Sequence, residues 1–287
     1  MRDDLNKTPR QAIPCFLCGS SKVEDETASY LKCPDCLTIS MKTPPPPSET
    51  LGNSHVYERV SDHRDARVLS ILNKLAGTPG SLLDLGCGNG AFLRLAFDNG
   101  WTGRGVDGSP KLVASSQKRG TQVELCDLDQ WERRNDDPYD AVRLWYTLEH
   151  IAHPGRLVRL ALKSLKPGGV LLVGVPNDAT PLSRRLMSPP SDRLWENRLH
   201  LHHYPPFGLE RFLEKLGMTI AFADATLPSE LLRSGTIPFE EAIKHAGEME
   251  EAWEKGRDVV PQIASVFYKL GVGRSREIFF TKNVSTE

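Results

Sequence analysis

Short apolar runs alternate with amphipathic stretches through the middle of the chain. The clearest amphipathic stretch runs from Pro154 to about Leu165, with proline at its first helical position and Pro-Gly-Gly after its end. Repeated alternation of strand and helix predicts an α/β fold, with a mainly parallel sheet covered by helices on both faces. The predicted strands are Ser81–Leu85, Gly103–Val106, Thr121–Leu125, Ala141–Trp145 and Val170–Val175.

The alternation ends after the fifth predicted strand. A lid-like segment follows at 178–204, which is rich in Pro, Arg and His and has no clear periodicity. Later in the chain, 228–270 is a highly charged and mostly helical insertion. Two last strands, predicted on either side of this insertion, are Thr219–Ala223 and Glu277–Thr281.

Composition and charge narrow the class of protein. Of 287 residues, 39% are hydrophobic and 25% charged, which is enough for an ordinary globular core. The net charge of −1 creates no global field toward polyanions, which argues against a nucleic-acid partner. No apolar run approaches the ~20 residues that span a bilayer, and the first residues, MRDDLNKTPR, lack a secretion signal. We therefore expect a cytoplasmic protein with no membrane partner.

Two Cys-x-x-Cys pairs lie near the start of the chain, with 14 residues between them. Four thiolates on two tight turns form a soft, tetrahedral ligand set, so we predict one structural zinc ion per chain. Two disulfides, or four unrelated thiols, are the alternatives. Since all four positions are thiolates, the predicted site is closed and has no catalytic role. Its ligands are Cys15, Cys18, Cys33 and Cys36.

These cysteines define the first of three predicted regions. A zinc-ribbon-like module occupies 1–43, a proline-rich linker 44–55, and the α/β domain 56–287. The linker contains Pro44–Pro47, and a proline run adopts a stiff, extended form that suits a spacer.

A glycine-rich turn, Asp84-Leu-Gly86-Cys87-Gly88-Asn-Gly90, lies where the first predicted strand gives way to a helix. Glycines let the backbone turn sharply and approach a ligand closely. The spacing is GxGxG and differs from the GxGxxG of dinucleotide-binding turns. Asp84 can hold the ammonium group of a ligand with an amino-acid portion, whereas Cys87 is interpreted as a packed side chain within the loop.

Acidic residues end the next two strands. Asp107, followed by Gly108, can accept hydrogen bonds from both hydroxyls of a ribose. Asp127, followed by Leu128, can accept from an adenine amino group. Because the carboxyl ends of parallel strands share one edge of a sheet, these acids are expected in one ligand crevice. The alternative for each is a polar strand end without a ligand.

These residues resemble the successive motifs of class I S-adenosylmethionine-dependent methyltransferases. The matching segments are LLDLGCGNGAFL, GVDGSP, ELCDLD and YDAVRLWYTLEHIAHPGRLVRLALKSLKPGGVLLVGVPN, in the family's order and spacing. The last is similar to the branch that contains ubiquinone-biosynthesis O-methyltransferases and many natural-product methyltransferases. The resemblance covers roughly residues 15–225, since the cysteine pairs resemble a zinc-binding lead often fused to such enzymes.

This resemblance implies a Rossmann-like sheet of seven strands in the order 3-2-1-4-5-7-6, with the seventh strand antiparallel. It implies that the loop glycines line the methionine part of S-adenosylmethionine, that Asp107 holds the ribose, and that Asp127 and Leu128 frame the adenine. Trp145 would lie beside the cofactor near the acceptor pocket. The complete predicted cofactor set is Asp84, Gly86, Cys87, Gly88, Gly90, Asp107, Gly108, Asp127, Leu128 and Trp145.

Two histidine-containing segments supply the catalytic candidates. Glu149 and His150 directly follow the fourth strand, and we predict His150 as a general base or as a group that positions the acceptor. The alternatives are His150 packed behind the loop and Glu149 as a metal ligand. The second segment, HLHHY, offers His200 and His203 for acceptor contact or base catalysis. A metal site and structural hydrogen bonding are the alternatives there.

The predicted function is transfer of a methyl group from S-adenosylmethionine to an oxygen or carbon atom of a small metabolite, by in-line displacement. The alternatives are an RNA or protein methyltransferase that docks its substrate on the zinc module, and a non-catalytic S-adenosylmethionine-binding scaffold. An anionic acceptor is suggested by arginines in the lid-like segment, namely Arg184, Arg185, Arg193 and Arg198.

Overall fold

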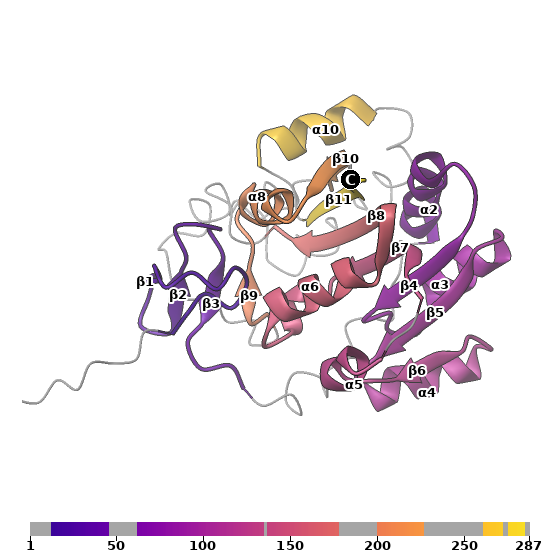
Figure 1. Ribbon diagram of the computed structural model, residues 1–287, viewed down its shortest axis with the longest axis horizontal. Coiled ribbons are helices and arrows are strands. Elements are labelled where there is room, and N and C mark those ends of the chain that lie inside the picture. The colour runs from indigo at the N-terminus through magenta and orange to yellow at the C-terminus, as the bar shows by residue number, and fades with distance from the viewer. Residues whose placement is uncertain are drawn as a thin grey trace, which may run out of the picture.

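The computed structural model describes residues 13–45, 62–134, 137–177, 200–226, 261–271 and 275–284. Within these ranges the strands form two sheets, one of seven strands and one of four (Figure 1). The larger sheet contains, in spatial order, β10 (Met218–Ala225), β11 (Ser275–Lys282), β8 (Leu165–Pro176), β7 (Tyr139–Trp145), β4 (Ser81–Leu85), β5 (Thr102–Asp107) and β6 (Val123–Leu125).

The strand order of the larger sheet confirms the predicted topology. When its strands are counted along the chain, their order is 3-2-1-4-5-7-6. Strand β11 is antiparallel to both β8 and β10, and the other neighbouring pairs are parallel. The carboxyl ends of β4, β5, β6 and β7 therefore share one edge of the sheet, where open α/β sheets bind their ligands.

Helices cover both faces of this sheet because its central strands are apolar on both sides. On β4, Leu82 faces one core and Leu83 the other, and Leu172 and Leu171 of β8 divide in the same way. One face carries α2 (Asp62–Ala76), α3 (Ala91–Asp98) and α4 (Pro110–Lys118), and the other carries α5 (Leu128–Glu132), α6 (Pro154–Lys163), α8 (Gly208–Lys215) and α10 (Pro261–Lys269) (Figure 1).

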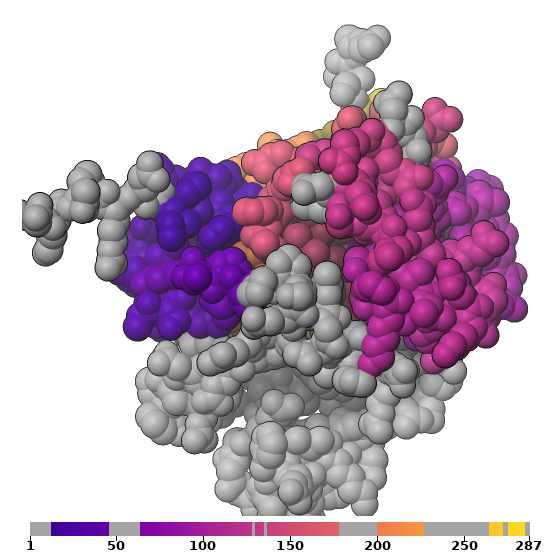
Figure 2. Space-filling model, turned by 90° about the horizontal axis from the view of Figure 1, so that it is seen from below, coloured from indigo at the N-terminus to yellow at the C-terminus, as the bar shows by residue number. Residues whose placement is uncertain are grey.

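The smaller sheet joins two distant parts of the chain. Its strands are, in spatial order, β1 (Glu24–Asp25), β2 (Tyr30–Lys32), β3 (Ile39–Met41) and β9 (His202–His203). Strand β9 comes from the end of the predicted lid-like segment and pairs antiparallel with β3. We call residues 13–45 the cysteine module. It shares a sheet with the α/β domain and lies against it in both views (Figure 1 and Figure 2).

Two glycines let the cysteine module approach the α/β domain closely. The N–H of Gly155 in α6 donates to the Phe16 carbonyl at 3.1 Å, and a Cβ at Gly155 would lie 2.0 Å from the Leu17 carbonyl oxygen. A Cβ at Gly208, the first residue of α8, would lie 2.1 Å from the Cys36 carbonyl oxygen. Each Cys-x-x-Cys turn therefore rests on the start of a helix that tolerates no side chain there.

Among the predicted strands only Ser81–Leu85 has the observed limits, and two of the differences have a clear structural reason. The third strand begins at Val123 instead of Thr121, because the Thr121 N–H is bonded to the Ser116 carbonyl in the turn that ends α4. The fifth begins at Leu165 instead of Val170, because Leu165 already pairs with Tyr139 of β7. The remaining predicted strands lie within β4, β5, β7, β10 and β11.

Several predicted regions are only partly described, and the zinc-ribbon-like module is described from residue 13. The linker is described to residue 45, the lid-like segment from His200, and the insertion from Pro261, where α10 is helical as predicted. Among the helices that the structure describes, none is both long and apolar enough to cross a membrane.

Candidate functional site

The glycine-rich turn has an open side and a packed side. Gly86 and Gly88 have φ angles of 78° and 61°, in the left-handed region that favours glycine. A Cβ at Gly86 would lie 2.5 Å from the Thr147 side chain, whereas a Cβ at Gly88 would meet nothing within 4 Å. Gly86 is therefore required for packing, and the backbone at Gly88 is accessible to a ligand.

Asp107 lies beside this open side, at the end of β5. Its Oδ2 accepts from the Gly88 N–H at 2.8 Å, and its Oδ1 accepts from the Ser109 N–H at 2.8 Å. Burial raises the pKa of Asp107, and these two backbone hydrogen bonds act in the opposite direction. Each oxygen keeps acceptor capacity beyond its backbone bond, so the carboxylate is oriented to receive a pair of hydroxyl groups.

Asp84 lies below the turn and is fully buried. Its Oδ2 accepts from Arg143 Nη1 at 2.9 Å, and its Oδ1 accepts no hydrogen bond from any described residue. Burial raises the pKa of Asp84, and the guanidinium of Arg143 opposes that rise. Arg143 is a partner that the sequence analysis did not identify. The role of Asp84 toward an ammonium group stays a prediction.

The other predicted cofactor residues have local roles of their own. Asp127 caps α5: its Oδ1 accepts from the Gln130 N–H at 2.7 Å, while Gln130 Oε1 accepts from the Asp127 N–H at 3.0 Å. Cys87 is buried, and burial holds its pKa well above the usual value, so it is a neutral packed side chain. The ring of Trp145 is also buried and packs against Gly174.

Gly108 and Leu128 complete the predicted cofactor set. Gly108 is half-buried and directly follows the oriented carboxylate. Leu128 is the first residue of α5, and its side chain lies outside the described part of the structure. Contacts of either residue with an adenine or ribose stay predictions.

Three of the predicted catalytic residues come together at the end of β7. One side-chain ligand atom from each of Glu149, His150 and His200 lies within 4.8 Å of the others. The His150 Nε2 is 3.8 Å from Glu149 Oε1, and the His150 and His200 ring centroids are 5.1 Å apart. Glu149 is buried, whereas His150 and His200 are partly exposed, so the two rings are the accessible part of this group.

The group of Glu149, His150 and His200 is formed by two segments, which we name here. The histidine turn is residues 148–151, which begin with the short 3-10 helix Leu148–His150, and the histidine segment is residues 200–204. Within the histidine segment, the His203 ring centroid is 6.2 Å from that of His200 and 5.8 Å from that of Tyr30 in β2. His203 therefore faces the cysteine module as well as the other histidines.

His202 has a structural role, which the sequence left open. Its Nδ1 is 2.9 Å from Ser40 Oγ, and its Nε2 is 3.0 Å from the Ile151 carbonyl oxygen. Burial lowers the pKa of His202 to about 3, so the ring is neutral near pH 7. A base for the reaction has to be sought in the partly exposed rings.

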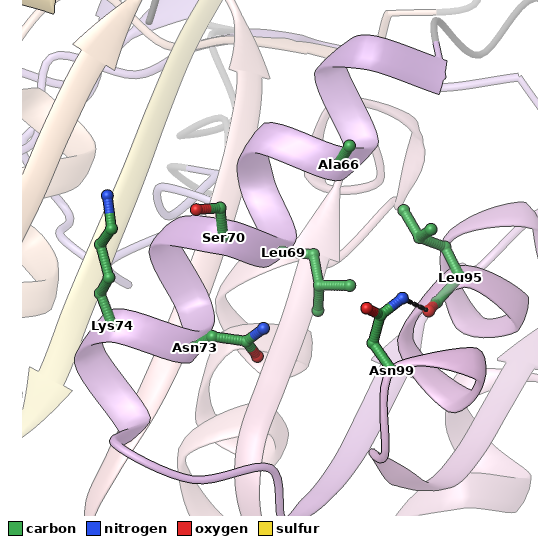
Figure 3. A pocket seen from close by; sticks show the side chains of 7 residues that line it. All are labelled: Ala66, Leu69, Ser70, Asn73, Lys74, Leu95 and Asn99. Carbon is green, nitrogen blue, oxygen red and sulfur yellow. Dashed lines mark hydrogen bonds between the residues drawn. The ribbon is translucent and has the colours of Figure 1, made fainter.

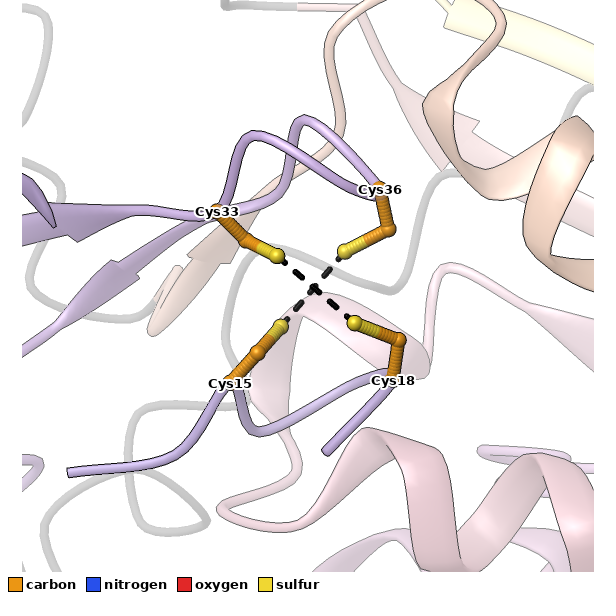
Figure 4. A group of neighbouring side chains, drawn as sticks. All are labelled: Cys15, Cys18, Cys33 and Cys36. Atoms are coloured by element: carbon orange, nitrogen blue, oxygen red, sulfur yellow. Dashed lines mark hydrogen bonds between the residues drawn. The ribbon is translucent and has the colours of Figure 1, made fainter. Parts of the chain in front are cut away.

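The four cysteines of the predicted zinc site converge on one point (Figure 4). All four Sγ atoms lie within 4.8 Å of one another, with Cys15 to Cys36 at 3.5 Å and Cys18 to Cys33 at 3.6 Å. All are free thiols, so the disulfide alternative is wrong. A tetrahedron with Zn–S bonds of about 2.3 Å has S···S edges of about 3.8 Å, and this cluster fits those dimensions.

The geometry of the glycine turn agrees with the family that the motifs indicate. Residues 60–221 match a family model described as a methyltransferase domain. The chain belongs to this family. Trans-aconitate 2-methyltransferase of Mycobacterium sp. (strain KMS) is 31% identical over 169 residues, which are 57% of this chain and 64% of that protein. Ubiquinone biosynthesis O-methyltransferase of Caulobacter vibrioides is 29% identical over 103 residues, or 34% of this chain and 41% of that protein.

Solved structures support the fold of this methyltransferase-family protein. A SAM-dependent methyltransferase from Archaeoglobus fulgidus has a TM-score of 0.53 and 20% identity to it, covering 80% of this chain and 97% of that one. The chain spans less than two thirds of the length of either curated relative above. The predicted family and fold are confirmed.

Sequence reasoning missed a buried ion network between α2 and the last two strands. Arg67 Nη1 donates to Glu277 Oε2 at 3.1 Å, and Arg67 also pairs with Asp224. Arg64 Nε donates to Glu277 Oε1 at 2.6 Å, and the same guanidinium bonds the Tyr146 hydroxyl after β7. The partners of Arg67 lie more than 150 residues away along the chain, so no local pattern reveals them.

A surface hollow lies outside the candidate site. It is lined by residues of α2, including Ser70 and Lys74, and by Leu95 and Asn99 near the end of α3 (Figure 3). The Asn99 Nδ2 donates to the Leu95 carbonyl at 2.8 Å at its rim. This is the end of α3 away from the glycine-rich turn, so the hollow lies apart from the candidate site.

Proposed function

We propose that this protein transfers a methyl group from S-adenosylmethionine to an oxygen or carbon atom of a small metabolite. The observation that carries the proposal is the Asp107 carboxylate, which two backbone N–H groups orient beside the open side of the glycine-rich turn. Membership of the methyltransferase-domain family supports the same reaction. The partly exposed ring of His150 follows the end of β7 at that sheet edge, and the partly exposed ring of His200 packs against it.

The residues present fit the cofactor. S-adenosylmethionine supplies a methyl group that its sulfonium has already activated for displacement. The backbone at Gly88 can approach the methionine part, because a Cβ there would occupy open space. Asp107 would accept from the ribose hydroxyls, and Asp127, which caps α5 at the end of the neighbouring strand, would accept from the adenine amino group. Binding in this orientation aligns the acceptor with the methyl group, which can contribute about 7–11 kcal/mol.

The histidine turn handles the proton of the acceptor. A ring nitrogen of His150 takes the proton from the acceptor hydroxyl or acidic carbon, or positions that group for transfer. Glu149, whose Oε1 is 3.8 Å from His150 Nε2, stabilises the imidazolium that forms. Base catalysis of this kind contributes roughly 10²–10⁴-fold. His200 packs its ring against that of His150 and shares the same accessible region, so the proposal gives it a contact with the acceptor as well.

An anionic acceptor is part of the proposal. The acceptor named for the mycobacterial relatives, trans-aconitate, is an anion. The arginines that suggested an anionic acceptor lie within 178–199, outside the described residues. A panel of small carboxylates, phenols and nucleotide-linked sugars would test this part of the proposal.

The cysteine module holds one zinc ion in this proposal, bound by the four convergent thiolates. A closed site with four thiolates is structural, so the ion stabilises the fold of the module and takes no part in methyl transfer. Burial argues against the alternative in which the module docks RNA or protein. Leu17 and Cys33 are fully buried, and both Cys-x-x-Cys turns rest on helix starts of the α/β domain.

Paired substitutions test the division between cofactor binding and transfer. Asp107→Ala removes two hydrogen bonds to a charged group, about 3 kcal/mol in total, and should raise the Kd for S-adenosylhomocysteine about 100-fold. His150→Ala should leave that Kd within about threefold and lower kcat roughly 10²–10⁴-fold. Calorimetric titration and transfer of a labelled methyl group measure the two quantities.

The matched control for Asp107→Ala is Asp98→Ala, since Asp98 is an exposed acid of α3 that pairs with Arg94. This control should bind S-adenosylhomocysteine like the wild type. An unchanged Kd in Asp107→Ala would refute the ribose assignment. A turnover within twofold of wild type in His150→Ala would refute the role of that ring.

A further inference from the structure

The histidine turn is held in place by the histidine segment. The Leu201 N–H donates to the Glu149 carbonyl at 2.7 Å. The Tyr204 hydroxyl donates to the Leu148 carbonyl at 2.9 Å. Because carbonyls of the turn are bonded from this segment, the position of His150 depends on where the histidine segment lies.

The histidine segment is in turn held by the cysteine module. Strand β9 pairs with β3, so that His202 is opposite Ser40. The Met41 N–H extends this pairing by donating to the Leu201 carbonyl at 2.9 Å. The histidine segment therefore lies between the module on one side and the histidine turn on the other.

A continuous series of hydrogen bonds leads from Ser40 of β3, through the His202 ring, to the Ile151 carbonyl of the histidine turn. The Ile151 carbonyl can only accept, so the Nε2 of His202 carries the proton of the bond between them. A neutral ring then offers Nδ1 as an acceptor, and the Ser40 hydroxyl, 2.9 Å away, is its donor. Ser40 and His202 are 4% and 1% exposed, so water cannot easily replace either partner. The Ile151 carbonyl thus fixes the tautomer of His202, and the Ser40 bond holds the ring in the orientation that donates to the histidine turn.

We propose that Ser40 is a positioning residue for methyl transfer, which acts through His202 and the Ile151 carbonyl to set the placement of the His150 ring against His200. The inference rests on the proposed function of the histidine turn. It assigns to the cysteine module a part in aligning the acceptor, in addition to its own folding.

The size of the effect follows from how strongly transfer depends on alignment. A mutation far from the reacting atoms that misplaces a positioning group by about 1 Å can lower the rate about 100-fold. Loss of one hydrogen bond in a turn that keeps its two other bonds should move His150 less than that. We therefore expect Ser40→Ala to lower kcat about tenfold and to leave the Kd for S-adenosylhomocysteine within twofold, because the glycine-rich turn is not in this chain of bonds.

The experiment compares three variants of the full chain. Ser40→Ala removes the donor to His202, and Ser40→Thr keeps a hydroxyl on a strand position where a β-branched residue is well tolerated. Ser20→Ala is the matched control, because Ser20 Oγ donates to Asp35 on the exposed side of the same module. Nitrogen-15 spectra of the imidazole rings report tautomer and environment, and thermal unfolding and metal content verify that each variant is folded.

The proposal expects the His150 and His200 ring signals to shift in Ser40→Ala, to return in Ser40→Thr, and to stay unchanged in Ser20→Ala. Unchanged ring signals in a folded Ser40→Ala variant would overturn it, as would a Ser40→Thr variant that behaves like Ser40→Ala. The wild-type spectrum is an independent measurement, because a His202 protonated on Nδ1 also overturns the proposal. If no acceptor is methylated, the proposed function fails while these spectra still decide the positioning role.

Discussion

The proposed cofactor edge and the histidine region are built from different spans of the chain. At this proposed edge, Gly88, Asp107 and Asp127 lie at or just beyond the ends of three strands that are consecutive in the sequence and adjacent in the sheet. The histidine region instead combines β3 with the histidine turn and the histidine segment, which are far apart in the sequence. Local strand-to-helix turns define the first site, and long-range pairing assembles the second.

This difference predicts how the two regions respond to damage. The hydrogen bonds that orient Asp107 come from its own neighbourhood and from the glycine-rich turn, so they do not need the cysteine module. The ring placement of His150 depends on bonds that lead back to that module. Cofactor binding and methyl transfer should therefore be separable.

Loss of the proposed metal site should give the largest separation. Cys15→Ser combined with Cys33→Ser removes one ligand from each turn, and zinc content should fall from about one per chain to none. Because metal supplies much of the folding free energy of such a small module, β3 should detach from β9 and transfer should fall by at least about 100-fold. The Kd for S-adenosylhomocysteine should stay within about threefold.

Elemental analysis, calorimetry and the transfer assay measure these three quantities. Cys126→Ser is the control for metal content, since Cys126 is a buried thiol of the α/β domain outside the cluster. An equal loss of cofactor affinity and transfer would show that the two regions fold as one unit, which would break the comparison.

A buried acid under the cofactor edge should give an effect of intermediate size. Burial raises the pKa of Asp65 in α2 to about 6, although Arg143 lies 3.8 Å away. A carboxyl whose pKa is higher in the folded chain stabilises the fold fully below about pH 4, and this contribution is lost as the pH rises through about 6. Asp65→Asn should therefore gain up to about 3 kcal/mol of unfolding free energy relative to wild type between about pH 4 and pH 7.

Urea unfolding at both pH values measures this difference. Asp98→Asn, an exposed acid, should show no comparable change. A constant difference between Asp65→Asn and wild type at the two pH values would mean that the burial of this carboxyl does not affect its ionisation. A difference that grows with pH would instead sharpen the comparison, because it would show that the proposed cofactor edge also has a part defined by tertiary burial.

The smallest expected effect separates two roles of Asp127. Asp127→Ala removes the cap of α5 and should cost about 1 kcal/mol of unfolding free energy. Asp127→Ser keeps a capping oxygen but shortens the side chain, so it should restore stability while S-adenosylhomocysteine binding stays several-fold weaker. Thermal unfolding and calorimetry distinguish the two. If Asp127→Ser binds S-adenosylhomocysteine with wild-type affinity, Asp127 acts only as the cap of α5 and does not contact the cofactor.

The sequence predicted those parts that depend on near neighbours. Strand β4 has its predicted limits, and the strand order is the predicted one, because alternation of apolar strands and helices restricts the topology. The glycine-rich turn and Asp107 were found for a similar reason, since the required φ angles and the acidic strand end leave a contiguous signal. The convergence of the four cysteines also followed from spacing, because two short turns carry all four ligands.

By itself, then, the sequence determined the sheet, the glycine-rich turn and the composition of the cysteine cluster. Only the tertiary structure decided that His202 is a neutral structural residue, that Arg143 pairs with Asp84, and that the module rests on α6 and α8. The physical reason is that burial and partner choice depend on residues distant along the chain. A histidine beside two other histidines has the same local pattern whether it faces an acceptor or donates to a buried carbonyl.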